Sequence, residues 1–180
     1  TSGRGVVSLS LLDDKGDSVF SGDINVGGPI SQQSVYSIEG IIDNPKLWSA
    51  EEPNLYLLKV EVKGEDGEIL EVTTQNVGFR RFEMVDGIMT LNGKRIVFKG
   101  VNRHEFSSIT GRVPNREEVI KDIVVMKQNN INAIRTSHYP NKTSLYRLCD
   151  TYGIYLIDEA NLETHGTWDA IIRDKETIDT

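Results

Sequence analysis

The sequence predicts two parts: an antiparallel β-sandwich over residues 1–84 and the beginning of a parallel α/β sheet over residues 85–180. In the first part, apolar residues alternate with polar ones at the period of a half-buried strand. In the second part, short apolar runs alternate with helical patterns, which is typical of parallel strands with helical crossovers. The chain's three histidines, His104, His138 and His165, lie just beyond three of those runs. Parallel strands that share one face collect their chemistry at these ends.

Antiparallel strands account for the first part. Residues 57–62 and 70–75 alternate between apolar and polar side chains, and residues 64–67 between them contain the Asp-Gly pair typical of a hairpin turn. Residues 13–17 predict another turn of the same kind. A sandwich has about 100 residues, so we expect one strand to be missing from the N-terminal end.

The second part begins with a hairpin and continues with two helices. Asn92-Gly93, between runs at 88–91 and 95–98, is the strongest two-residue hairpin signal. Asn115 has the character of an N-cap, with the glutamate of a capping box three residues later. The apolar positions expected on the two helices are Val119, Ile120, Ile123, Val124 and Met126, then Leu145, Leu148 and Tyr152.

Three expected parallel strands alternate with these helices, at residues 96–101, 133–135 and 154–157. The last follows Gly153, a predicted helix C-cap, and has no polar alternation, which suits a strand covered on both faces. This order begins either a doubly wound sheet or a (β/α)8 barrel.

A full barrel needs eight units and typically about 250 residues, whereas about three units fit here. A sheet of three strands would leave an open edge and an uncovered apolar face. We therefore expect the chain to be a segment of a larger protein, or to hide its open edge by self-association.

Composition limits the function further. The chain has 180 residues, 38% of them hydrophobic, and a net charge of -7, which argues against a nucleic-acid partner. No segment has the length of a membrane span or the pattern of a signal peptide, so we expect no membrane partner. The lone Cys149 is expected in the core and is compatible with a reducing compartment. We expect a cytoplasmic protein.

Glu163 and His165 form the first candidate site. Their i, i+2 spacing in an extended loop puts both side chains on one side, where they could share a divalent cation. Two ligands do not make a metal site, however. The spacing alone favours the alternative, a carboxylate hydrogen-bonded to a histidine without metal.

The other candidates lie at the first two strand ends. Arg135 and His138 follow one another closely, and Arg is suited to holding a carboxylate in a bidentate contact. The alternative for Arg135 is an ion pair with Asp158 or Glu159 on the neighbouring strand. His104 could bind sugar hydroxyls, because a neutral imidazole both donates and accepts; the alternative is a structural histidine at the end of the strand.

Taken together, these segments resemble glycoside hydrolase family 2. The resemblance rests on residues 132–140 (NAIRTSHYP) with the apolar run to residue 157, on 100–105 (GVNRHE), on 158–166 (DEANLETHG), and on 44–49 (NPKLWS) with 53–56 (PNLY). The second and third of these motifs resemble the β-galactosidases of the family more than its β-glucuronidases or β-mannosidases. The likeness covers nearly the whole chain.

The resemblance implies an immunoglobulin-like sandwich followed by the first units of a TIM barrel. It also implies retaining hydrolysis of terminal β-D-galactosides such as lactose, through two carboxylates about 5 Å apart. By resemblance, Glu163 and His165 ligate Mg²⁺, which displaces the metal-free alternative for that pair. His104 and His138 contact galactosyl hydroxyls, and Arg135 hydrogen-bonds the nucleophile. The parent enzyme is expected to be a homo-oligomer.

The acid/base and nucleophile glutamates of the family belong to later barrel strands, beyond Thr180, so we expect this chain alone to be inactive. Asp158 and Glu159 match a structural pair of the family and are not candidates for either role. Two alternatives stay open: a sibling enzyme such as a β-glucuronidase or β-mannosidase, and a non-catalytic module that binds sugar or another protein.

Overall fold

The chain forms two compact units, Thr1–Ile96 and Val97–Thr180. The computed structural model describes residues 2–29 and 33–162. The sequence-based boundary between residues 84 and 85 stays a prediction; the hairpin that follows it belongs to the first compact unit. In the described part of the chain, no helix has the length and apolar character needed to cross a membrane.

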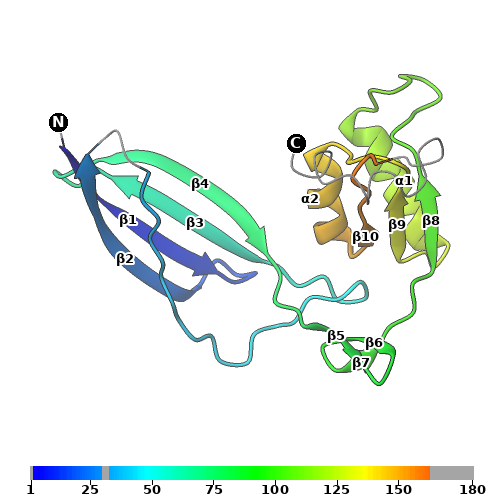
Figure 1. Cartoon of the computed structure of the whole chain (residues 1–180), viewed down its shortest axis with the longest axis horizontal. Helices are drawn as coiled ribbons and strands as arrows, with labels where there is room; N and C mark the ends of the chain where they lie inside the picture. The colour runs from blue at the N-terminus through cyan, green and yellow to red at the C-terminus, as the bar shows by residue number, and fades with distance from the viewer. Residues whose placement is uncertain (1, 30–32, 163–180) are drawn as a thin grey trace, which may run out of the picture. The chain divides into compact units, whose positions relative to one another are not determined.

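The first unit contains a four-stranded antiparallel sheet in the order β2-β1-β3-β4 (Figure 1). Its strands are β1 (Ser2–Leu12), β2 (Ser18–Pro29), β3 (Tyr56–Lys63) and β4 (Ile69–Val77). Both predicted turns are confirmed. Gly16 and Gly67 have φ angles of 87° and 82° at the two turns, a conformation that favours glycine.

The alternation predicted for this sheet is only partly realised. Val60 and Val62 on β3 are half-buried, as expected. On β4, Leu70 and Val72 are 60% and 49% exposed. Within the described sheet β4 is an edge strand that pairs only with β3, so the alternation alone predicted more burial than these two side chains have.

A long connection between β2 and β3 packs back onto the unit. Trp48 within it is 2% exposed, and its indole ring lies 5.0 Å from the Arg80 guanidinium carbon. The Tyr56 and Phe79 rings meet edge to face at 5.1 Å. The Asn92 side chain donates to the Trp48 carbonyl at 3.1 Å, so the hairpin that follows is tied to this connection.

That hairpin forms a three-stranded antiparallel sheet of β5 (Phe82–Val85), β6 (Ile88–Leu91) and β7 (Lys94–Arg95). The turn at Asn92-Gly93 is confirmed, with φ angles of 53° and 77°. The strand expected over residues 95–98 is shorter than predicted. Ile96 still donates to the Met89 carbonyl at 3.0 Å, but the chain then leaves the hairpin.

The second unit is a three-stranded parallel sheet in the order β10-β9-β8 (Figure 1). Its elements are β8 (Gly100–Arg103), α1 (Arg116–Gln128), β9 (Ala133–Thr136), α2 (Thr143–Tyr152) and β10 (Tyr155–Ile157). The first strand begins at Gly100, later than the expected residue 96. The Asn132 side chain accounts for the difference, because it accepts from the Lys99 N–H and donates to the Val97 carbonyl.

Both helix caps are confirmed. Asn115 accepts from the Glu118 N–H at 2.9 Å while the Glu118 carboxylate accepts from the Asn115 N–H at 2.8 Å, which completes the capping box. Gly153 ends α2 in the left-handed conformation, with φ at 71°.

One hydrophobic cluster holds this unit together. Its buried members are Val119, Ile123, Ile134, Leu145, Leu148, Cys149 and Ile154. Because both helices contribute to one cluster with Ile134 of β9, they cover the same face of that strand. Cys149 is 3% exposed, which confirms its expected place in the core. Burial raises the pKa of its thiol to about 12.

Candidate active site at the strand ends

The parallel sheet brings the carboxyl ends of its three strands to one edge. His104 directly follows β8, His138 lies two residues beyond β9, and Asp158 and Glu159 directly follow β10. The histidine rings of His104 and His138 lie 5.7 Å apart at 82° to each other. The structure therefore brings together two of the three histidines that the sequence singled out.

Glu159 is the centre of this cluster. Its carboxylate pairs with the Arg135 Nε atom, and its Oε2 atom lies 2.8 Å from His138 Nδ1. Arg135 also donates through Nη1 to the Asn102 side-chain oxygen at 3.3 Å. Of the two readings of Arg135, the ion pair across neighbouring strands is the contact that this structure contains. A contact with the nucleophile stays a prediction.

Asp158 is held by two hydroxyl groups. The Thr136 hydroxyl donates to its Oδ1 atom at 2.7 Å, and the Tyr146 hydroxyl from α2 lies 2.9 and 3.0 Å from its two oxygens. The Thr136 oxygen in turn accepts from the Glu159 N–H at 3.0 Å. Burial and the neighbouring Asp158 carboxylate raise the pKa of Tyr146, against the opposing hydrogen bond from the Asn141 N–H.

A buried arginine fixes the first strand end to the rest of the unit. Arg103 is 6% exposed and donates from Nε and Nη2 to one Asp122 oxygen on α1, at 3.1 and 3.0 Å. Its Nη1 atom donates to the Asn141 side chain at 3.0 Å. Next to it, Glu105 accepts from the Lys142 N–H at 3.1 Å. These bonds connect the β8 end to α1 and to the segment before α2.

Sequence reasoning did not single out Thr136, Tyr146, Asn141 or Asn102. Asn102 and Thr136 had a usable signal, because each lies at a strand end within a motif quoted above, 100–105 and 132–140. Glu163 and His165 lie outside the described residues, so the predicted metal pair has no structural description. Among the residues that are described, no group of three or more His, Cys, Asp or Glu side chains could hold a metal ion.

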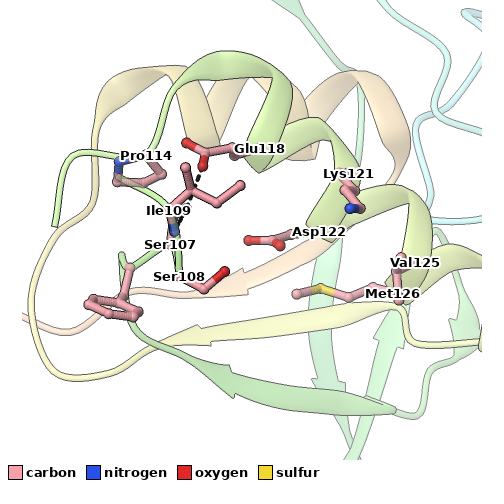
Figure 2. Close-up of a pocket in the computed structure, with 10 residues that line it drawn as sticks. Ser107, Ser108, Ile109, Pro114, Glu118, Lys121, Asp122, Val125 and Met126 are labelled. Carbon is pink, nitrogen blue, oxygen red and sulfur yellow. Dashed lines mark hydrogen bonds between the residues drawn. The ribbon is translucent and has the colours of Figure 1, made fainter. Parts of the chain in front are cut away.

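A separate pocket of about 350 Å³ lies between α1 and the loop before it (Figure 2). It is lined by Phe106, Ser107, Ser108, Ile109, Pro114, Glu118, Lys121, Asp122, Val125 and Met126. Glu118 closes its rim by accepting from the Ser107 hydroxyl and from Thr110. Hydrogen bonds from the Ser107 hydroxyl, then the Asn115 N–H, then Thr110, lower the pKa of Glu118. Of the predicted site residues that the structure describes, His104, Arg135 and His138, none lines this pocket.

Two family models match the chain. The model described as glycosyl hydrolases family 2 matches residues 1–80, and the one described as its TIM barrel domain matches residues 82–178. The chain belongs to glycosyl hydrolase family 2. The predicted fold class, an immunoglobulin-like sandwich followed by the first units of a TIM barrel, is thereby confirmed, and the doubly wound alternative is excluded.

Relatives within the family are similar over most of the chain. A protein of Halalkalibacterium halodurans named β-galactosidase is 52% identical over 91% of this chain and 16% of its own length. One of Clostridium acetobutylicum with the same name is 63% identical over 69% of this chain and 14% of its own. The solved structure of a Bifidobacterium dentium β-glucuronidase has a TM-score of 0.73 at 30% identity, over 87% of this chain and 25% of that one.

The chain therefore spans about one sixth of the length of the curated relatives it matches. Within that span it includes the strand ends described above, where the family model places a barrel domain.

Proposed function

We propose that this chain is part of a β-galactosidase that hydrolyses terminal β-D-galactosides such as lactose with retention of configuration. Identities of 52% and 63% to relatives named β-galactosidase support this choice over the sibling activities, because the β-glucuronidase structure is only 30% identical. The single observation that carries the role of this chain is the convergence of His104, His138 and Arg135 at one edge of the parallel sheet.

The two histidines are proposed to contact galactosyl hydroxyls. Imidazole nitrogens suit that role, and contacts that strengthen as the sugar ring distorts would lower the barrier. The two catalytic carboxylates of a retaining enzyme are proposed to lie in the remainder of the parent protein. In this chain, Asp158 and Glu159 are already engaged by residues of β9, of α2 and of the segment after β9, which suits a structural role.

Mg²⁺ bound by Glu163 and His165 remains part of the proposal. The described residues offer no ligand group that would test its fit, and no step proposed for this chain depends on it. When bound, such an ion would supply positive charge beside the acid/base carboxylate.

The test is the substrate preference of the full-length parent protein. We expect a kcat/KM for a chromogenic β-galactoside that is well above those for the matching β-glucuronide and β-mannoside. A preference for β-glucuronide would favour the sibling enzyme. The 180-residue chain alone is expected to hydrolyse none of the three. If it binds galactose in a calorimeter without hydrolysing any glycoside, and the parent is also inactive, the non-catalytic sugar-binding module is the better account.

Self-association of the isolated chain is a second part of the proposal. β8 and β10 each have one neighbour in the described sheet, so each presents an unpaired edge. We propose that two copies of the chain pair through these edges, which sedimentation velocity at several concentrations would detect. We also propose that the parent is a homo-oligomer and that the protein is cytoplasmic.

A further inference from the structure

The contact between His138 and Glu159 indicates which imidazole nitrogen carries the hydrogen. His138 Nδ1 lies 2.8 Å from Glu159 Oε2, and the same carboxylate pairs with the Arg135 guanidinium. An ionised carboxylate only accepts hydrogen bonds, so Nδ1 must donate. A neutral imidazole has one N–H, and its Nε2 atom is then an acceptor.

A second contact at the same nitrogen competes with this assignment. The Arg135 Nη2 atom lies 3.4 Å from His138 Nδ1. Guanidinium nitrogens are always donors, so this contact is a hydrogen bond only if Nδ1 has a lone pair facing the guanidinium. The contact with the Glu159 carboxylate is shorter and charge-assisted, which favours Nδ1–H over an accepting Nδ1.

A chain of hydrogen bonds holds Glu159 in place. Its N–H donates to the Thr136 oxygen, the Thr136 hydroxyl donates to Asp158, and Asp158 also accepts from Tyr146. The Tyr146 oxygen accepts from the Asn141 N–H at 3.0 Å. Each hydroxyl thus uses one donor and one acceptor position, so the direction of every bond is determined. The network connects the backbone of Glu159 to β9 and α2.

We propose that Glu159 is a positioning residue that selects the Nδ1–H tautomer of His138, so that Nε2 accepts a hydrogen bond from a ligand hydroxyl. This inference rests on the proposed function, which makes a sugar the ligand, and it adds a direction to the His138 contact. The hydroxyl that meets His138 donates. The Tyr146–Asp158–Thr136 bonds support Glu159, and Tyr146 on α2 reaches them from outside the strand ends.

Nitrogen NMR of the 180-residue chain tests the tautomer without any activity measurement. In a ¹⁵N-labelled sample at pH 8, two-bond ¹H–¹⁵N correlations should show His138 as the Nδ1–H form, with its signals assigned by their loss in His138→Asn. Glu159→Gln should convert it to a mixture of tautomers, because a glutamine side chain can donate as well as accept. Glu105→Gln is the matched control, since a glutamine oxygen can still accept from the Lys142 N–H.

Three results would overturn the proposal: the Nε2–H form, a doubly protonated ring, or a Glu159→Gln spectrum identical to that of the unsubstituted chain. If the NMR shows the expected tautomer but the parent hydrolyses no β-galactoside, the proposed function is wrong and the role of Glu159 stands. The two failures are therefore distinguishable.

Substrate analogues test the direction of the bond in the full-length parent. We would compare kcat/KM for 2-, 3-, 4- and 6-deoxy galactosides with kcat/KM for the galactoside itself. The contacted hydroxyl is the one whose removal lowers kcat/KM less in His138→Ala than in the unsubstituted enzyme. Its deoxyfluoro counterpart should lose as much kcat/KM as the deoxy compound, up to about tenfold for one neutral hydrogen bond, because fluorine cannot donate. If fluorine restores most of the activity, Nε2 donates and the proposal is wrong.

Discussion

Replacing Thr136 by valine tests the network beneath the strand ends. The substitution keeps the shape of the side chain and removes only its hydroxyl. That hydroxyl is fully buried, at 0% exposure, donates to Asp158 at 2.7 Å and accepts from the Glu159 N–H at 3.0 Å. Water cannot replace it without opening the core.

The magnitude follows from the two bonds. A hydrogen bond to a charged group contributes about 1.5–3 kcal/mol, and leaving a buried N–H unsatisfied costs about 1–3 kcal/mol. Because the two terms share one group and do not simply add, we expect a loss of about 3 kcal/mol in the stability of the second unit. That corresponds to an increase of about 150-fold in the opening constant of its most protected amides.

Native-state hydrogen exchange is the suitable assay, because the chain has two compact units and a single unfolding transition cannot be assumed. The readout is the slowest amides of α1, β9 and α2. Thr151→Val is the matched control: Thr151 is exposed, and its hydroxyl bonds only to the Arg147 carbonyl of its own helix, at 2.9 Å. It should change stability by less than about 0.5 kcal/mol. If Thr136→Val exchanges no faster than this control, the network does not stabilise the unit.

Other substitutions test the helix cap, the core and two titrating groups. Asn115→Ala removes the capping box of α1 and should cost about 1 kcal/mol by the same exchange assay. Ile134→Ala at the centre of the cluster should cost about 2–5 kcal/mol. Because hydrogen bonds, first from the Ser107 hydroxyl, lower the pKa of Glu118 from its ordinary 4.5, the carboxylate stabilises the fold above that pH, and this contribution is lost as the pH falls through its lowered value. Stability measured between pH 7 and 3 should therefore fall more steeply than in Glu118→Gln, and parallel curves would refute this. With its pKa raised to about 12, Cys149 should react with a thiol reagent at pH 8 only after unfolding; rapid reaction of the native chain would contradict its burial.

Local signals in the sequence were sufficient wherever a few adjacent residues determine the structure. The capping box at Asn115, the C-cap at Gly153 and the hairpin at Asn92-Gly93 each need only neighbouring residues and a fixed backbone geometry. The position of β8 was not predictable in the same way. Asn132, more than thirty residues away, binds the backbone before that strand and delays its start.

The cluster at the strand ends was predictable in part. Parallel strands bring their carboxyl ends together, so the proximity of His104 and His138 followed from the pattern. The ion pair of Arg135 with Glu159 was among the expected alternatives, but the hydroxyl groups that hold Asp158 were not expected. Thr136 and Tyr146 reach the β10 end from another strand and from a helix, across separations of more than ten residues. The spacing of residues along the chain does not predict contacts between such distant residues.

The central claim is that these strand ends contact the galactosyl group in the parent enzyme. It is tested most directly by kcat/KM of the full-length His138→Ala variant for a chromogenic β-galactoside, beside Arg147→Ala on the exposed surface of α2. We expect a loss of about tenfold to a hundredfold for His138→Ala, the effect of losing contacts that strengthen in the transition state, and no change for Arg147→Ala. Equal kcat/KM values for the two variants would contradict the account.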